Sequence, residues 1–518
     1  MGRFTLVILV CLSLFTFRLG MSRAANLTET DVRLIVDQTA SAAQQLGLRV
    51  CIAVTDREGN ALALFKMNGA PKNSRVVGEP GQGLEGGMLP AQDAVVTKAG
   101  TAAFLSSNQH AFSTRTASFI VQDHFPPGVD FTPGGPLFGV QFSSLPCTDF
   151  KSPPLPFGLS ADPGGVPLFK SGELVGGLGV EGDGVYGLDL DPSDEDLPIE
   201  ERVAVTGSRG FSAPDSIRGD GVFLDGIRLP FVNALVESVA VISVAGKYKQ
   251  GPRAGLPSGF VPASVGGITG ESDPRFPLRS GSLLSANEVE TMLAQAARQA
   301  LKTRAAIRQP LGSAAKVNIA VVDLDGAILG FFRLEDASIF GAEVSVQKAR
   351  TAAFFSSPAT GSDLTRLGLG GFLRDVPLDG RYAYTTRAIG FLAQPYYPPG
   401  IQGTAPGPFS FPVPEWSPFN TGLQLALVLA NLNHSGSCNP ALPQLGNGIT
   451  IFPGGIPLFK SGRLAGAIGV SGDGVDQDDL IAAAGSVGFE APSDRRCDRL
   501  FVRGVRLPYV KFPRHPNL

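Results

Sequence analysis

Histidine, tryptophan and cysteine are scarce in this chain of 518 residues, which has four histidines, one tryptophan and five cysteines. The motifs H-E-x-x-H, G-x-S-x-G, C-x-x-C-H and the P-loop are absent. The sequence therefore gives no indication of a zinc protease, a serine hydrolase, a covalently attached cofactor or a nucleoside triphosphatase. Residues 177–182 fit G-x-G-x-x-G, but an acidic stretch follows where a dinucleotide site needs a helix N-terminus. A dinucleotide site is not expected.

The chain also has no large excess of charge of either sign, because its 43 Lys and Arg nearly balance its 46 Asp and Glu, for a net charge of −3. Binding to a nucleic-acid backbone needs a clustered basic surface, and no Lys/Arg-rich run occurs, so nucleic acid is not expected as a partner. The hydrophobic content of 43% suffices for two cores of substantial size. We therefore expect a folded, globular protein.

A long segment of the chain occurs twice. Residues 163–185 and 453–475 share Pro-Gly-Gly-x-Pro-Leu-Phe-Lys-Ser-Gly and continue to the same Gly-Asp-Gly-Val. Further blocks match in the same order, namely 27–32 with 284–289, 50–65 with 317–332, 98–104 with 348–354, and 223–231 with 501–509. The chain is interpreted as a domain and its tandem copy. We expect the first domain at 26–245, a linker rich in Gly, Pro and Ser at 246–282, and the second domain at 283–518.

The matched blocks predict the same local elements in each copy. A hydroxyl residue followed three positions later by an acid, at Thr28 and again at Ser285, has the spacing of a capping box and predicts a helix start. The acidic, glycine-containing turns at Asp56 and Asp323 lie between two apolar runs and predict β-hairpins. The Ala-rich blocks predict helices that pack closely on a sheet.

The N-terminus has the pattern of a secretory signal. Arg3 precedes an apolar run over residues 4–17, and Ser22-Arg-Ala24 offers small residues for signal peptidase. We expect a signal peptide over residues 1–25, a periplasmic or secreted mature protein, and no membrane span after cleavage. The alternative is a retained N-terminal anchor, for which the run is short.

Four cysteines follow the expected signal peptide, namely Cys51, Cys147, Cys438 and Cys497. An oxidising compartment favours disulfides among them. Cys147 and Cys438 precede their Pro-Gly-Gly turns by similar distances, so a bond between the copies is one option. Cys438 with Cys497 is a second option, and unpaired buried thiols are a third. None of the four has metal-ligand spacing, so no metal site is expected.

The histidines His110, His124, His434 and His515 have no histidine at the corresponding place in the other copy. A histidine-ligated site shared by both copies is therefore excluded. A site in one copy would use His110 or His124, which border the matched segment around Arg115. The alternative for each is a solvated loop histidine.

Both copies retain polar residues and glycines that are candidates for binding a small-molecule ligand. A cation beside a glycine-rich turn can hold a carboxylate, because side chain and backbone N–H groups donate to the same anion. A structural role competes, since Gly-Gly permits a turn with positive φ and arginines pair with local acids. The candidates are Lys98, Thr101, Arg115, Gly164 and Gly165 in the first copy and Lys348, Thr351, Arg387, Gly454 and Gly455 in the second. No catalytic residue is assigned.

Four of these blocks together resemble the GlcG/HbpS-like domains, also called haem-degrading or DUF336 domains and related to the C-terminal domain of PduO-type proteins. They are the V-x-D-x-x-G hairpin, the K-A-x-T-A-A helix, the G-G-[VI]-P turn and the G-[AG]-[IL]-G-V-[SE]-G strand end. The resemblance implies an α/β fold, an α+β sandwich, with an antiparallel sheet of about five strands flanked by helices in each copy. It also implies haem as ligand, with haem degradation or redox sensing as activity, and a tendency to oligomerise.

Long Pro- and Phe-rich insertions at residues 112–162 and 361–452 distinguish this chain from the shorter family domain. Such loops usually form lids, interfaces or disordered segments. Their aromatic residues suit either a pocket for a flat apolar ligand or a seam between the copies of an intramolecular pseudo-dimer. Three functions are therefore compared: an exported haem-binding protein, a non-catalytic structural or partner-binding protein, and an enzyme or sensor for a small hydroxy acid such as glycolate. The volume of the pocket discriminates among them.

Overall fold

The computed structural model describes residues 26–77, 85–129, 131–140, 147–150, 155–189, 191, 194–412, 422–432 and 440–511. The expected signal peptide, Cys438, His434 and His515 lie outside the described residues. Among the described helices, none is both long and apolar enough to cross a membrane.

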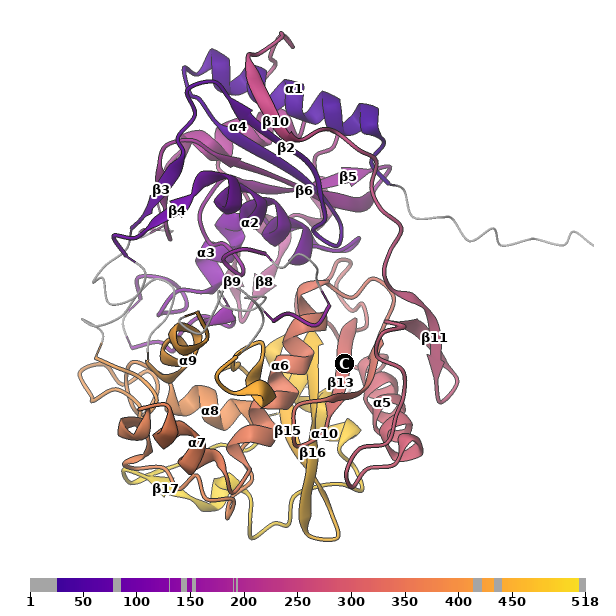
Figure 1. Cartoon of the computed structure of the whole chain (residues 1–518), viewed down its shortest axis with the longest axis vertical. Helices are drawn as coiled ribbons and strands as arrows, with labels where there is room; N and C mark the ends of the chain where they lie inside the picture. Colours follow the sequence, from indigo (N-terminus) through magenta and orange to yellow (C-terminus); the bar gives the residue numbers. More distant parts are fainter. Residues whose placement is uncertain are drawn as a thin grey trace, which may run out of the picture.

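Two antiparallel sheets with the same central strand order form the framework (Figure 1). The first runs β10-β2-β1-β6-β5 and the second β11-β12-β14-β13-β16-β15. Their equivalent strands are β1 (Cys51–Asp56), β2 (Ala61–Met67), β5 (Gly165–Lys170) and β6 (Glu173–Glu181), and β13 (Val317–Val322), β14 (Ile328–Arg333), β15 (Gly455–Lys460) and β16 (Arg463–Gly472). These sheets and the helices around them confirm the predicted fold class.

Helices at equivalent places in the chain cover the two sheets. They are α1 (Glu29–Gln45), α2 (Ala91–Phe104), α3 (Thr114–Ile120) and α4 (Ile199–Gly207), and α5 (Ala286–Ala300), α6 (Phe340–Phe355), α8 (Thr386–Leu392) and α10 (Val475–Gly485). Both predicted capping boxes are present, Thr28 with Asp31 at α1 and Ser285 with Glu288 at α5. In each box the hydroxyl and the acid satisfy backbone N–H groups that the helix leaves free.

Glycines in the central strands let the Ala-rich helices approach the sheets closely. A Cβ atom at Gly177 would lie 2.0 Å from the carbonyl oxygen of Ala99 in α2. At Gly469 of the second sheet it would lie 1.9 Å from the carbonyl oxygen of Ser345 in α6. Any side chain at either position would push the helix off the sheet, so the small residues of strand and helix act together.

The segment between the copies differs from the expected linker, because it contributes strands to both sheets. β10 (Gly246–Gln250) pairs with β2, and the hairpin of β11 (Val261–Val265) and β12 (Ile268–Ser272) joins the second sheet through β14. Most of these strand residues are exposed or half-buried. These strands do not need a regular alternation of apolar residues, which is why the sequence pattern did not predict them.

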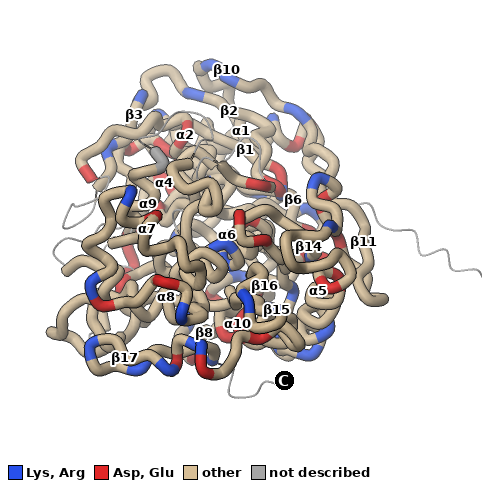
Figure 2. The backbone as a smooth tube through the Cα atoms, turned by 60° about the horizontal axis from the view of Figure 1, so that its bottom comes forward, with Lys and Arg blue, Asp and Glu red and all other residues tan. Residues whose placement is uncertain are grey.

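The other described elements lie around this framework. A small sheet joins β3 (Asn73–Val76), β4 (Met88–Pro90) and β7 (Val185–Tyr186), and two short hairpins occupy equivalent places, β8 (Phe223–Leu224) with β9 (Ile227–Arg228) and β17 (Phe501–Val502) with β18 (Val505–Arg506). Two further helices are α7 (Thr360–Arg366) and α9 (Gly422–Leu432), and 3-10 turns cover Asp215–Ile217, Gly219–Gly221, Gly370–Leu373, Pro443–Leu445 and Cys497–Arg499. Lysines, arginines and acids are interspersed over both halves (Figure 2).

One of the apolar clusters spans the two halves, in addition to the clusters within each half. Phe112 and Leu229 of the first half and Phe340 and Phe452 of the second belong to the same cluster of buried side chains. Burial of apolar surface between the copies stabilises their association within the chain.

The bonding state of the described cysteines rules out one of the two predicted disulfides. Cys147 is disulfide-bonded, whereas Cys51 and Cys497 are free and buried. A bond between Cys438 and Cys497 is therefore ruled out. Burial raises the pKa of the Cys51 thiol to about 11 and that of the Cys497 thiol to about 12, so both thiols stay protonated at neutral pH.

Candidate functional site

Lys98, in the middle of α2, is fully buried among three carboxylates. Its Nζ lies 2.5 Å from Asp162 Oδ2 and 2.8 Å from Glu181 Oε2, and it also donates to Glu200 Oε2. Asp162 precedes the Pro-Gly-Gly turn, Glu181 ends β6, and Glu200 lies in the first turn of α4. One ammonium group thus joins a turn, a strand and a helix.

This cluster holds three carboxyl groups and one ammonium group. Burial lowers the pKa of Lys98, but the three acids outweigh burial and raise it well above its usual value. Burial raises the pKa of Asp162 to about 7 and also raises that of Glu200, although Lys98 opposes both shifts. The carboxylate oxygens of the three acids are close enough to hold a metal ion. The ammonium group of Lys98 contacts all three acids, so it takes the place that a cation would occupy.

The equivalent lysine of the second copy has only one acidic partner. Lys348 Nζ, in α6, lies 2.7 Å from Asp478 Oδ2 and 4.9 Å from the centre of the Phe452 ring. Phe452 and Ser471 occupy the repeat positions of Asp162 and Glu181. Burial lowers the pKa of Lys348 and raises that of Asp478 to about 7. The two copies have therefore diverged at this place.

The predicted threonines connect the Ala-rich helices to the segments before the Pro-Gly-Gly turns. Thr101 Oγ1 donates to the Thr97 carbonyl at 2.8 Å and accepts the N–H of Ser160 at 2.7 Å. Thr351 Oγ1 repeats the arrangement, donating to Gln347 at 2.7 Å and accepting from Thr450 at 3.0 Å. Both hydroxyl groups are engaged within the protein.

The predicted arginines also have internal partners. Arg115 lies 2.8 Å from Glu201, 2.7 Å from Asp196 and 3.1 Å from Asp189. Arg387 lies 2.5 Å from Asp479 and 2.6 Å from Asp476. Each arginine thus fixes the start of the helix that follows its sheet.

The paired glycines form the turns that the sequence predicted. Gly164 and Gly454 have φ of 117° and 115°. A Cβ at Gly165 would lie 2.6 Å from the carbonyl oxygen of Lys98, and one at Gly455 would lie 2.4 Å from that of Lys348. The ten predicted residues therefore surround the buried lysines in two equivalent groups, and a direct role in ligand binding stays a prediction for them.

A cavity of about 760 Å³ lies between the two halves and adjoins the second of these groups. Its apolar walls include Leu105, Phe112 and Leu229 of the first half and Ile307, Phe340 and Phe452 of the second. The polar lining side chains are Asp225 of the first half and Thr303, Arg304, Ser471, Asp476, Gln477, Asp478 and Lys511 of the second. Sequence reasoning missed this site because its walls come from both copies.

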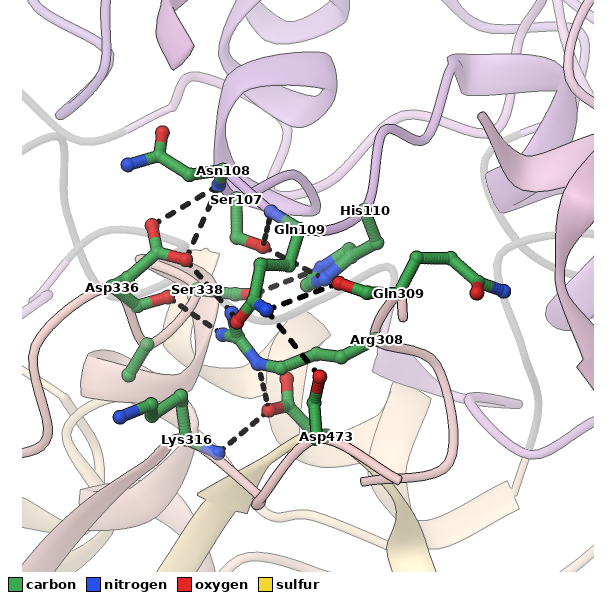
Figure 3. Close-up of polar contacts among 12 residues, drawn as sticks. Ser107, Asn108, Gln109, His110, Arg308, Gln309, Lys316, Asp336, Ser338 and Asp473 are labelled. Atoms are coloured by element: carbon green, nitrogen blue, oxygen red, sulfur yellow. Dashed lines mark hydrogen bonds and ion pairs between the residues drawn. The ribbon is translucent and has the colours of Figure 1, made fainter. Parts of the chain in front are cut away.

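A buried arginine, Arg308, directly follows the residues 303, 304, 306 and 307 that line the cavity. Figure 3 shows the polar network around it. Arg308 donates through Nε to Asp473, and its Nη1 lies 2.7 Å from Asp336 Oδ2 and 3.2 Å from Gln109 Oε1. Asp336 also lies 2.7 Å from Arg57 of the first half. This network fixes the cavity wall to both halves at once.

The two candidate histidines, His110 and His124, both have polar partners within the protein. His110 is buried between Ser107 Oγ, 2.8 Å from Nδ1, and Ser338 Oγ, 3.1 Å from Nε2 (Figure 3). Burial lowers its pKa to about 3, so it is neutral at physiological pH. His124 Nδ1 lies 3.0 Å from the carbonyl oxygen of Thr132. Neither lines the cavity.

The fold is thus an α+β arrangement of antiparallel sheets with helices, and one segment of its second half matches a known family model. Residues 423–486 match a family model described as haem degrading protein HbpS-like. This match confirms the GlcG/HbpS-like resemblance for the second half, over the segment that contains β15, β16, Phe452, Ser471 and Asp478.

Two solved structures are similar to this chain at low sequence identity. The Klebsiella pneumoniae protein ORFY, a DUF336 protein, is 18% identical and covers 41% of this chain and 95% of its own, with a TM-score of 0.22. A PduOC–haem complex is 18% identical and covers 40% of this chain and 97% of its own, with a TM-score of 0.23. The comparison with curated proteins found no match.

Proposed function

We propose that this protein binds a flat, largely apolar ligand of the haem type in the cavity between its halves. The cavity carries this proposal, because its volume of about 760 Å³ lies in the upper part of the range of ligand pockets, roughly 300–1,000 Å³. A small hydroxy acid would leave most of such a space unfilled. The HbpS-like description of the segment that contributes Phe452 supports haem as the ligand class.

The lining residues suit the ring and the carboxylates of such a ligand. Aromatic and aliphatic side chains from both halves offer flat apolar contact, and Arg304 and Lys511 provide cations. In the described chain, the lining contains no histidine, cysteine, methionine or tyrosine, so no axial ligand is assigned. Lys348 has a positioning role, since it holds the Asp478 carboxylate at the wall.

Export and activity extend the same proposal. The N-terminal pattern of Arg3, the apolar run and Ser22-Arg-Ala24 supports a signal peptide and a periplasmic or secreted location. A haem-degrading or redox-sensing role rests on the family resemblance.

Haemin titration of the purified full chain tests the binding proposal. We expect a shifted Soret band at micromolar haemin. Phe223→Asp should weaken binding by about tenfold or more, because Phe223 lines the cavity and its apolar contact with the ring would be lost. Haemin absorbance during titration gives the dissociation constants.

Phe501→Asp is the matched control for this titration. Phe501 begins the equivalent hairpin β17–β18 and is 63% exposed, compared with 60% for Phe223, but it does not line the cavity. Its substitution should leave haemin binding unchanged. Absence of a Soret shift for the wild-type protein, or equal losses in the two variants, would contradict binding in this cavity.

A further inference from the structure

The first turn of α10 forms part of the cavity wall. Gly474, Val475, Asp476 and Gln477 all line the cavity and are partly exposed. Within the described residues, the N–H groups of residues 475–477 have no hydrogen-bond acceptor, and Asp478 donates the first bond of the helix, to Gly474. Free N–H groups at a helix N-terminus attract anions.

This helix start has no side-chain cap, for a steric reason. Gly474, the N-cap residue, has a φ of 149°. A Cβ at this position would lie 2.2 Å from Gln477 Oε1 and 2.9 Å from Ala306 Cβ. The positive φ disfavours any residue with a side chain, so a serine, threonine or aspartate cap is disfavoured here, whereas α1 and α5 both have complete capping boxes.

The acids near this helix start are compensated by cations. Asp476 lies 2.6 Å from Arg387 and 2.9 Å from Lys511, and Asp478 lies 2.7 Å from Lys348. These pairs leave the positive end of the helix dipole without a net opposing charge. Arg304 adds a further cation to the lining.

A buried hydroxyl group at the same wall is a second, independent observation. Ser471 is 1% exposed and lines the cavity, and its Oγ has no hydrogen-bond partner among the described residues. A buried polar group without a partner destabilises the protein unless another molecule supplies one. In the first copy the same position is Glu181, whose carboxylate lies 2.8 Å from Lys98.

We propose that the first turn of α10 and Ser471 bind a carboxylate carried by the cavity's ligand. The ligand class is then an amphipathic organic acid, with an apolar ring or chain against the shared walls and a carboxylate at the helix start. The N–H groups of residues 475–477, the Ser471 hydroxyl and Lys511 donate to this carboxylate. This inference rests on the proposed function, because it uses the same cavity, but it concerns a different part of the ligand.

A pair of probes that differ in charge tests this inference on the full chain. We expect 2-naphthoate to bind about tenfold more tightly than the neutral methyl 2-naphthoate, because hydrogen bonds to a charged acceptor are the stronger ones. Val475→Pro removes one N–H group at the first helical position, where proline is compatible with the helix. Val475→Pro and Ser471→Ala should each reduce this preference several-fold, as measured by quenching of naphthyl fluorescence.

Ile199→Pro is the matched control, because Ile199 is the first residue of the equivalent helix α4 and does not line the cavity. It should leave the preference for 2-naphthoate unchanged. Equal binding of the two probes to the wild-type protein, no binding of either, or an unchanged preference in both Val475→Pro and Ser471→Ala would overturn the inference. Circular dichroism of each variant shows whether the helices are retained.

Haemin titration separates the two proposals. If 2-naphthoate shows the expected preference but haemin gives no Soret shift, the carboxylate site stands and haem is excluded as the ligand. If haemin binds and Phe223→Asp alone weakens it, but neither α10 variant changes the preference between the probes, the haem proposal stands and the role of α10 is refuted.

Discussion

Replacing Lys98 by methionine is expected to lower the free energy of unfolding by about 3–5 kcal/mol, because a buried ion pair that loses one partner leaves uncompensated charge. Methionine preserves most of the volume, so the loss reports on charge. Asp162, Glu181 and Glu200 would then face one another without the ammonium group that contacts all three. Urea unfolding of the full chain near neutral pH, followed by circular dichroism, measures the change.

Lys348→Met provides the comparison within the same molecule. Lys348 has one acidic partner, Asp478, so its loss leaves one buried carboxyl group without its counter-ion, compared with three beside Lys98. We expect less than about half the loss seen for Lys98→Met. Adding Glu181→Gln and Glu200→Gln to Lys98→Met should restore part of the stability. Equal losses in the two single variants would show that the number of acids does not set the effect.

The folded state is expected to become more stable as the pH falls from about 8 to about 5. Burial raises the pKa of Asp162, Glu343 and Asp478 to about 7 each, above the usual 3.8 to 4.5 of these carboxyls. Between these values the native state binds protons that the unfolded chain does not, so lowering the pH favours folding. Each of the three carboxyl groups contributes up to about 1.4 kcal/mol per pH unit in this window, and His110, whose pKa burial lowers to about 3, opposes them with a similar slope below its usual pKa of 6.5. The melting temperature at a series of pH values is the measurement.

Glu343→Gln isolates one of these contributions. Glu343 accepts hydrogen bonds from the N–H of Asp149 at 3.1 Å and from Asn447 Nδ2 at 2.9 Å, and glutamine retains an acceptor without the charge. The variant should show a shallower rise in melting temperature between pH 8 and pH 5, which are about the limits of the window. A melting temperature that is flat or falls over this range in the wild-type protein would show that these carboxyls are ionised in the folded state.

Sequence patterns predicted the parts of the fold that depend on local interactions. The capping boxes at Thr28 and Ser285 and the turns at Gly164 and Gly454 have causes within a few residues of chain, and all four are present. The strands between the copies were not predicted, because main-chain pairing with β2 and β14 determines them and their side chains are mostly exposed or half-buried.

The candidate site was predicted only in part, since its partners come from distant segments. The repeat singled out Lys98 and Lys348, but their acidic partners in α4 and α10 fall outside the closely matched blocks. The sequence did contain one indication of this difference. Glu181 aligns with Ser471, which shows that the two copies diverge beside the buried lysines. Pattern analysis within a single copy cannot predict the cavity, which needs walls such as Leu229 and Ile307 from both.

The pairing of β10 with β2 determines where an N-terminal fragment of the chain can end and still be soluble. A fragment that ends at residue 245 would expose the outer edge of β2, whose central residues Leu62 to Phe65 are buried in the intact protein. Uncovered apolar edges recruit other chains and lead to aggregation. An N-terminal fragment that is soluble on its own would therefore have to extend beyond Gln250. Its end would then lie in the segment between the two repeats, which the repeat pattern assigns to neither copy.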